Sequence, residues 1–359
     1  MRVFIPLVKG HDDIHNMWNP YIYTLTDYLE KEHQDIEFFY NIEMFGTKEV
    51  FSFDIVHIMW PDIFFYIGDV SVYRERLRQI KREGSKIIIT CHNRVPHYID
   101  DKQKKLFYEV TYQEADIIIH LGKCSRTLFE EMYPKAKHVL IPHHVYDTVY
   151  TDICKRKPFL KRYIACIGAF RDKEEINLLK EAGKTLAFTR YFILAPSLMI
   201  NAQWKRRNKL ALIWPVFKMV WLRWRYHIVT YDKRWINHDS LTKYMNSSCI
   251  SFISRVANLN SGNLTLGFLF GNVVVGPNIG IIGEILRDLG NPTFDPKNME
   301  SLKSAMNKAI HLHKCGKGKD NKKYALNNWS TRIIAEKHYK VYVSMNTRGN
   351  NSHKTTVAK

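Results

Sequence analysis

Short apolar runs alternate with amphipathic, helix-length segments along most of the chain. Over residues 1–150, runs rich in β-branched and aromatic residues predict strands, and apolar residues at helical spacing predict helices. The predicted strands are Val3–Val8, Glu37–Tyr40, Asp54–Trp60, Lys86–Cys91, Asp116–Leu121 and His138–Ile141, and the predicted helices are Pro20–Glu30, Val70–Glu83 and Lys102–Glu114. Such alternation indicates parallel βαβ units, so we expect residues 1–150 to form one Rossmann-like α/β domain.

The alternation lapses after Ile141-Pro142 and resumes at Tyr163. The intervening residues 151–161 are polar and basic and contain Pro158, which is typical of a linker. The next predicted strands are Tyr163–Ile167, Phe188–Leu194, His227–Tyr231, Cys249–Ser254 and Val273–Gly276, and the predicted helices are Glu174–Ala182, Asp239–Asn246, Leu264–Gly271 and Met299–Lys314. We therefore expect a second Rossmann-like domain over residues 162–330, in an α/β fold whose two doubly wound parallel sheets face a cleft.

The end of the chain leaves the alternating pattern. The lysine-rich run Lys314–Lys323 is interpreted as a solvated loop. Residues 331–346 predict a C-terminal helix that crosses back to the first domain. The polar residues 347–359 predict a disordered tail.

Residues 197–226 interrupt the second series, where a short crossover between strands is expected. The segment mixes Lys and Arg with Trp and aliphatic residues. Such a mixture is typical of a helix that lies in the interface of an anionic membrane. A crossover helix that packs its apolar side on the sheet has a similar pattern, so both interpretations stay open.

Composition and charge narrow the classes of partner. A chain of 359 residues with 45% hydrophobic and 13% aromatic residues can bury two cores, which excludes disorder for its body. The 54 Lys and Arg residues exceed the 35 Asp and Glu residues by 19. This excess favours a polyanionic partner, such as nucleic acid, anionic lipid or a phosphorylated substrate, although a generally basic surface would have the same composition.

Cysteine usage and hydropathy predict a compartment. The six cysteines contain no CxxC pair, which indicates free thiols in a reducing environment and argues against a zinc site. The opening MRVFIPLVKG is too short in apolar residues for a signal peptide, and no window reaches the roughly 18 apolar residues of a membrane span. We expect a cytoplasmic protein, and a contact with the inner face of the cytoplasmic membrane stays open.

A Ser-Gly turn precedes the helix predicted at Leu264–Gly271. Asn260, Ser261, Gly262 and Asn263 form this turn. A helix that begins there points unpaired backbone N–H groups and the positive end of its dipole at one spot, which suits a phosphate. A doubly wound sheet binds nucleotides at such a position.

Short motifs follow in order along the second domain: G-A-F-R-D-K at Gly168–Lys173, D-S-L at Asp239–Leu241, S-G-x-L at Ser261–Leu264, G-x-V-V-V at Gly271–Val275 and G-x-x-x-E at Gly280–Glu284. Together they resemble the motifs of GT-B-type glycosyltransferases, specifically the family 4 (group 1) enzymes of bacterial surface-polysaccharide type. Cys249 stands where that family usually has Asp, and the match at Lys173 requires a one-residue gap.

The resemblance implies a nucleotide-sugar donor site in the second domain. Arg171 and Lys173 would grip the diphosphate, because a guanidinium and an ammonium stabilise the charge on a departing diphosphate. Glu284 would hold a hydroxyl of the ribose or the sugar. A surface charge pair at a helix start is the alternative for Arg171 and Lys173. The predicted donor-binding residues are Gly168, Arg171, Lys173, Asn260, Ser261, Gly262, Asn263 and Glu284.

Motifs of the first domain resemble the same family: N-P-Y from Asn19, D-I-V-H-I-M-W-P-D at Asp54–Asp62, T-C-H-N-R-V-P-H at Thr90–His97 and I-P-H-x-x-Y at Ile141–Tyr146. Their histidines follow predicted strands and would face the cleft, where an imidazole can hydrogen-bond a sugar hydroxyl. A structural hydrogen bond is the alternative for each. We predict His92 as a catalytic residue and Asp12, Asn19, His57, Asn93 and His97 as acceptor-side residues.

One departure from the family affects the predicted chemistry. Many members carry two glutamates, one near the donor sugar and one near the ribose, where this chain has Asn258 and Leu266. Asn258 is therefore the second candidate catalytic residue, and the retention of anomeric configuration that the family implies is in doubt. The change fits either a subgroup of the family or a chain with weakened activity.

We therefore expect a hexosyltransferase that moves a sugar from a nucleotide-sugar donor to a hydroxyl of a glycan or lipid-linked acceptor, in the biosynthesis of capsule or lipopolysaccharide. The HDDIH run at His11–His15 lacks further residues that would complete a metal-ligand set, so we expect neither a metal nor a cofactor. Two rivals remain: a basic nucleic-acid-binding protein, which leaves the Ser-Gly turn unexplained, and a non-catalytic sugar-nucleotide-binding homologue.

Overall fold

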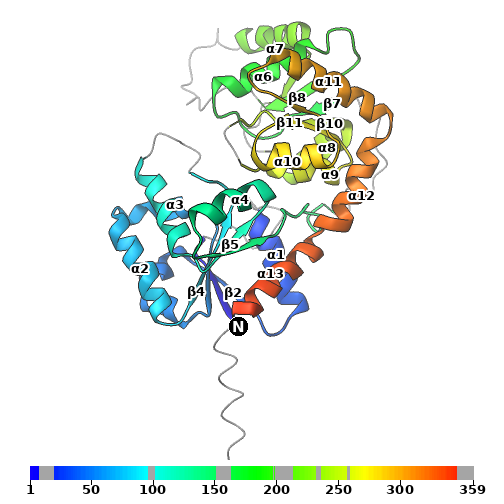
Figure 1. Cartoon of the computed structure of the whole chain (residues 1–359). Coiled ribbons are helices and arrows are strands. Elements are labelled where there is room, and N and C mark those ends of the chain that lie inside the picture. The colour runs from blue at the N-terminus through cyan, green and yellow to red at the C-terminus, as the bar shows by residue number, and fades with distance from the viewer. Residues whose placement is uncertain are drawn as a thin grey trace, which may run out of the picture. The chain divides into compact units, whose positions relative to one another are not determined.

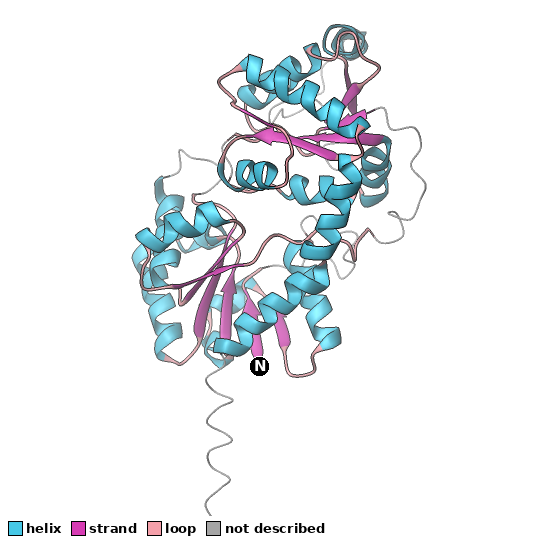
Figure 2. Ribbon diagram, turned by 45° about the vertical axis from the view of Figure 1, so that its right-hand side comes forward, coloured by secondary structure: helices cyan, strands magenta, loops and turns pink. Residues whose placement is uncertain are grey.

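A computed structural model describes residues 1–7, 20–95, 102–150, 163–196, 198, 213–231, 236–256 and 259–345. The chain divides into two units, one made of Met1–Val149 with Trp329–Lys359 and the other of Tyr150–Asn328. Each is built on a parallel sheet of six strands with helices on both faces (Figure 2). The expectation of two doubly wound, Rossmann-like α/β domains is confirmed. The predicted linker at 151–161 and tail at 347–359 lie outside the described residues.

The sheet of unit 1 has the strand order β2-β1-β3-β4-β5-β6, and every pairing is parallel. Its strands are β1 (Arg2–Ile5), β2 (Glu37–Tyr40), β3 (Ile55–Ile58), β4 (Lys86–Cys91), β5 (Ile117–His120) and β6 (Lys137–Leu140). The chain moves outward from β1 to β2 and then returns to the other side of β1 to form β3. The direction of strand addition therefore reverses between β1 and β3, a position where doubly wound sheets open a crevice.

Two groups of helices cover the faces of this sheet (Figure 1). On one face lie α2 (Val70–Arg82), α3 (Lys102–Glu114) and α4 (Lys123–Met132), with the 3-10 helices η2 (Ile42–Gly46), η3 (Lys48–Ser52) and η4 (Pro61–Ile67). On the other face, α1 (Tyr21–Glu32) packs against α13 (Thr331–Met345), which thus belongs to the first unit. Successive side chains of β3 face opposite sides of the sheet: Val56 and Ile58 belong to the core under α2, while His57 contacts α13.

The sheet of unit 2 has the order β12-β11-β10-β7-β8-β9, and its pairings are also parallel. Its strands are β7 (Tyr163–Ala165), β8 (Phe192–Pro196), β9 (Ile228–Tyr231), β10 (Ser248–Phe252), β11 (Val273–Pro277) and β12 (Thr293–Phe294). Strands β8 and β9 extend the sheet on one side of β7, and β10, β11 and β12 then extend it on the other side. The switch point of this sheet lies between β7 and β10.

Helices α6 (Lys173–Lys184), α7 (Ile213–Tyr226) and α11 (Met299–Lys314) share one apolar core with the sheet of unit 2. Helices α8 (His238–Ser247), α9 (Gly262–Leu269) and α10 (Gly280–Asp288) pack on the central strands. Residues Val273–Val275 of β11 are wholly buried, as expected for a parallel strand covered on both faces.

The structure corrects two predicted elements of unit 2. The run Lys314–Lys323, interpreted as a loop, contains the start of helix α12 (Lys317–Trp329). The buried Asn321 fixes this helix, because its Nδ2 donates to the carbonyl oxygen of Asn272 at 2.9 Å. The strand predicted from Phe188 begins only at Phe192, and Phe188 is fully exposed in the preceding loop.

Candidate functional site

The loops that follow β7 and β10 meet at the switch point of unit 2. Gly168, in the loop after β7, has a φ of +90°, which favours glycine. A Cβ atom on Gly168 would lie 3.1 Å from Nη2 of Arg255, which follows β10. A side chain at position 168 would therefore enter the space between the two loops.

Arg255 holds these loops together. Its Nη1 lies 2.5 Å from Oε2 of Glu175 in α6, and its Nη2 donates to the carbonyl oxygen of Ala169 at 2.6 Å. The pair is largely dry, since the side chains of Arg255 and Glu175 are 12% and 2% exposed. Oε2 of Glu175 also accepts from the backbone N–H of Arg171 at 3.0 Å. Glu175 thus balances the charge of Arg255 and also accepts a hydrogen bond from the backbone of Arg171. Arg255 in turn fixes the shape of the loop through the carbonyl oxygen of Ala169.

The start of α9 lies against the same loop. Nδ2 of Asn263 donates to the carbonyl oxygen of Ile167 at 2.7 Å, and it would lie 3.8 Å from a Cβ atom on Gly168. Ser261 is the N-cap residue of α9, but its side chain makes no capping hydrogen bond. The positive end of this helix is therefore presented beside the Gly168 turn without a side-chain cap.

A second helix start lies next to the first. The backbone N–H of Ile281 in α10 donates to the carbonyl oxygen of Leu259 at 2.9 Å. Gly280 has a φ of +52°, and a Cβ atom on it would lie 3.1 Å from that same oxygen. The N-cap residue of α10, Ile279, likewise makes no side-chain capping bond. The Ser-Gly segment thus lies between the amino ends of two helices, both of which favour an anion.

The predicted donor residues fall into two groups, and the predicted catalytic residue Asn258 is separate from both. Gly168, Asn263 and the backbone of Arg171 are joined by the contacts above, and Asn260, Ser261 and Gly262 adjoin them in half-buried positions. Lys173 is the exposed first residue of α6, after the N-cap Asp172, and Glu284 is a half-buried residue of α10. Asn258 lies outside the described residues.

The structure contradicts the prediction for His57. Its ring is wholly buried, with Nδ1 2.7 Å from the hydroxyl of Tyr342 in α13 and Nε2 2.9 Å from Oγ1 of Thr90. Burial lowers the pKa of His57 well below its usual range. His57 therefore helps to attach α13 to the sheet and is not exposed to an acceptor.

His92 and Asn93 follow β4 at the carboxyl edge of the sheet of unit 1. The half-buried ring of His92 stacks on Trp60, with centroids 5.0 Å apart, and meets the edge of Tyr21 at 4.7 Å. Asn93 is buried, and its carbonyl oxygen accepts from the hydroxyl of Tyr112 at 2.6 Å. The structure thus assigns the backbone of Asn93 a structural contact. Asp12, Asn19 and His97 lie outside the described residues.

Sequence reasoning missed several members of these sites. Arg255 and Glu175 are 80 positions apart, so local spacing carries no sign of their contact. His143 and His144 pack on Tyr21 with centroids at 4.5 and 5.1 Å. The motif I-P-H-x-x-Y at Ile141–Tyr146 pointed to these two histidines. The motif alone could not show whether they are buried in the core or face a ligand. Burial lowers the pKa of His143 to about 4.

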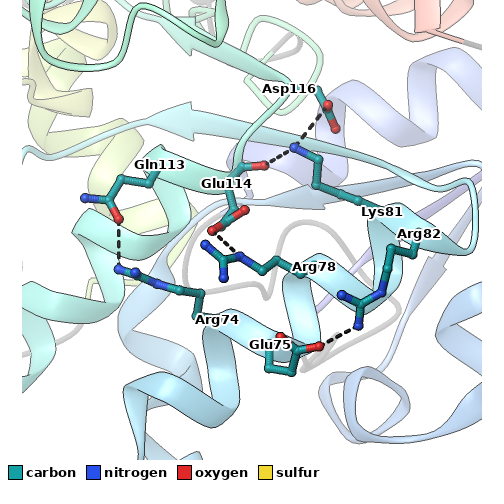
Figure 3. Close-up of polar contacts among 8 residues, drawn as sticks. All are labelled: Arg74, Glu75, Arg78, Lys81, Arg82, Gln113, Glu114 and Asp116. Atoms are coloured by element: carbon teal, nitrogen blue, oxygen red, sulfur yellow. Dashed lines mark hydrogen bonds and ion pairs between the residues drawn. The ribbon is translucent and has the colours of Figure 1, made fainter.

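A second polar cluster of unit 1 lies between α2 and α3, at the edge of the sheet opposite to His92 and Asn93. Figure 3 shows that Arg74, Arg78 and Lys81 are matched by acceptors from α3 and the residues after it, and Arg82 by Glu75 of α2. Arg74 donates to Gln113 at 2.8 Å, Arg78 to Glu114 at 2.9 Å, and Lys81 lies 3.3 Å from Asp116. We interpret this cluster as a scaffold between α2 and α3.

Neither a metal-ligand cluster nor a membrane-spanning helix is found among the described residues. No group of three or more His, Cys, Asp or Glu residues in these ranges could hold a metal ion. No helix in the same part of the chain has the length and hydropathy needed to cross a bilayer. The His11–His15 run lies outside these ranges, so the structure does not test it.

Comparison with solved structures identifies the architecture. HepE of Anabaena, in complex with UDP and glucose, superposes with a TM-score of 0.63 at 12% identity, over 96% of this chain and 99% of that one. Sucrose-phosphate synthase of Thermosynechococcus elongatus gives 0.64 at 11% identity, over 96% and 98%. The chain has the GT-B fold. No protein-family model and no curated protein matches its sequence.

The GT-B fold alone leaves the reaction open. A Listeria monocytogenes protein described as a UDP-N-acetylglucosamine 2-epimerase also superposes, with a TM-score of 0.55 at 11% identity over 93% of this chain and 94% of that one. Identities this low establish the shared architecture only, so the chemistry must be argued from the side chains of this chain.

Proposed function

We propose that the chain is a glycosyltransferase whose unit 2 binds a nucleotide-sugar donor at the switch point between β7 and β10. One observation carries this proposal: the Gly168 turn and the start of α9 are joined by Asn263, next to the start of α10 at Gly280, and neither helix start has a side-chain cap. Backbone N–H groups and two helix dipoles at one sheet edge favour a diphosphate.

The charged residues around this edge have different proposed roles. Arg255 is committed to Glu175 and positions the loop, so its charge is already balanced. Arg171, between that loop and α6, is the residue we assign to the diphosphate, with the exposed Lys173 as a second cation. Together they would stabilise the charge that develops on the leaving diphosphate without a metal. Glu284 is assigned to a hydroxyl of the ribose or the sugar.

The donor base is proposed from a structural neighbour, and the acceptor side from an aromatic stack in unit 1. HepE is described in complex with UDP and glucose, which makes a UDP-hexose the first donor to test. On the acceptor side, the Trp60–His92 stack in unit 1 offers an aromatic face and an imidazole, which suit a sugar ring and its hydroxyl. A hydroxyl of a glycan or lipid-linked acceptor in surface-polysaccharide biosynthesis, with retention of configuration, completes the proposal.

Calorimetric titration of UDP and UDP-sugars into the full chain tests the donor site. Arg171→Ala should weaken UDP binding by about 10- to 150-fold, the value of a charge-assisted hydrogen bond of about 1.5–3 kcal/mol. Arg82→Ala, which removes an exposed cation paired with Glu75, is the matched control and should leave UDP binding unchanged.

Enzymatic turnover requires a separate readout. The wild-type chain should release UDP slowly from a UDP-sugar in water, and faster with a polysaccharide acceptor. Nucleotide binding without release would indicate the non-catalytic homologue, and salt-sensitive binding of RNA or DNA without nucleotide binding would support the nucleic-acid rival. Unchanged UDP affinity in Arg171→Ala would remove Arg171 from the site.

A further inference from the structure

Helix α7 presents an apolar stripe to solvent, although it is part of unit 2. Phe217, Val220, Trp221 and Trp224 are 67%, 61%, 48% and 78% exposed. Their spacing of i, i+3, i+4 and i+7 places them on one side of the helix. Helix α7 itself lies at the margin of unit 2 (Figure 1). This arrangement is the reverse of that expected for a crossover helix, whose aromatic side should face the sheet.

The opposite side of α7 accounts for its packing. Leu222 is 2% exposed and belongs to the core of unit 2. The carbonyl oxygen of Tyr226 lies 2.0 Å from where a Cβ atom on Gly183 of α6 would be, so the two helix backbones are in close contact. Helix α7 therefore packs on the rest of unit 2 through Leu222 and Tyr226, and the aromatic stripe takes no part in this packing.

Basic residues flank the stripe on both sides. At about 100° per residue, Arg223 and Arg225 fall roughly 90–110° to either side of its centre. The guanidinium of Arg223 lies 5.4 Å from the ring centroid of Phe192, and Lys180 and Lys184 of α6 each place Nζ 5.9 Å from the ring of Tyr226. Apolar residues with Trp in the centre and cations at the edges are the arrangement of a helix lying in a lipid interface.

We propose that α7 docks unit 2 onto an anionic lipid bilayer, with the stripe in the headgroup and acyl boundary and the cations at the lipid phosphates. At 14 residues, α7 is about 21 Å long, which is too short to cross a hydrocarbon core of about 30 Å. The helix therefore lies along the surface. This inference does not depend on the proposed function.

The chemistry of the surface favours lipid over other partners. Nucleic acid would gain little from Val220, which offers neither charge nor an aromatic face. A second copy of this chain would bring together two molecules that each carry a formal net charge of +19. An anionic bilayer matches both the apolar centre and the basic edges.

Sedimentation of the full chain with vesicles tests the proposal. The wild type should bind vesicles of phosphatidylcholine with 30% phosphatidylglycerol, and bind pure phosphatidylcholine at least about tenfold more weakly. Phe217→Ser/Val220→Ser/Trp224→Ser should reduce binding to the anionic vesicles by about 10- to 100-fold. Arg225→Gln should reduce it about fivefold, because one basic residue is lost.

The matched control removes the same number of exposed apolar residues from unit 1. Val72→Ser/Leu106→Ser/Val343→Ser, at 56%, 44% and 47% exposure, should bind anionic vesicles like the wild type. Circular dichroism and the melting temperature confirm that each variant folds. Equal vesicle binding by the stripe variant and the wild type would overturn the proposal and assign the stripe to a second copy, to residues 199–212 or to nucleic acid.

A conservative substitution guards against misfolding of the triple variant. Trp224→Phe keeps an apolar ring, so it should retain vesicle binding within about twofold. Bromine-labelled lipids should quench the tryptophan fluorescence of the wild type on binding, and quench that of Trp224→Phe measurably less. Equal quenching of the two proteins would show that Trp224 does not reach the lipid and would likewise overturn the proposal.

Discussion

Arg255 and Glu175 are the residues on which the geometry of the candidate donor loop depends. The pair is nearly dry, and one oxygen of Glu175 serves both the guanidinium and the backbone N–H of Arg171. Removing one partner leaves the other charge buried and unmatched, whereas removing both leaves a cavity but no orphan charge.

Arg255→Met should therefore lower the free energy of unfolding by about 3–5 kcal/mol, and Glu175→Gln by a similar amount. The double variant should be more stable than the sum of the two losses implies, because the interaction between the two side chains is lost only once and no charge is left unpaired. Chemical denaturation of all four proteins measures the cycle. Strict additivity would show that the two side chains are not coupled in solution.

Residues whose position follows from the local backbone were placed correctly from the sequence, and those whose surroundings depend on distant contacts were not. Gly168 lies in the loop before α6 and Asn263 in the first turn of α9, so their positions in the fold followed from the sequence. His57 was misplaced because its imidazole is satisfied by Tyr342, which lies 285 positions away. A histidine near a strand end has the same local pattern whether it faces the core or solvent.

Elements followed from the sequence where hydrophobic periodicity dominates. The strands Lys86–Cys91 and Glu37–Tyr40 and the helices Lys102–Glu114 and Met299–Lys314 have the predicted bounds. Helix α12 did not follow, because lysines dominate its first turns and its anchor is the buried Asn321 network with Asn272 and Asn291. Polar anchoring of this kind has no apolar period for a pattern to reveal.

The close approach of Gly318 to Gly271 is a second reason why α12 was missed. A Cβ atom on Gly318 would lie 2.1 Å from the carbonyl oxygen of Gly271, so glycine is needed at position 318, while the φ of +68° at Gly271 favours glycine there. In the sequence, both glycines favour turns or helix ends rather than a helix interior. The element is thus determined by tertiary contact rather than by propensity.

At the scale of the whole molecule, acid should destabilise unit 1, because burial lowers the pKa of several of its described histidines. The pKa of His338 and of His143 falls to about 4 and that of His120 to about 3, while His57 and His144 also shift downward. Each is neutral when folded at pH values where the unfolded chain would protonate it.

The sign of the pH dependence follows from this difference. Between about pH 6.5 and pH 4, the unfolded state binds more protons than the folded state, so stability falls as the pH falls. His338 and His143 should each cost unit 1 about 2 kcal/mol at pH 5, relative to pH 7.5. Calorimetric melting at both pH values should show a lower transition temperature for unit 1, and His338→Gln should reduce the shift. A transition that does not move would contradict the burial of these rings.

Hydrogen exchange with and without UDP tests the central claim most directly, because it reports on the backbone amides of the candidate donor site. Saturating UDP should slow exchange in peptides covering Gly168–Asp172 and Ser261–Leu264, since amides that bind a phosphate are protected from solvent. Peptides of the Arg74–Asp116 cluster in unit 1 should exchange at the same rate in both states. The account would be contradicted if saturating UDP slowed exchange nowhere, or slowed it only in peptides outside both donor segments.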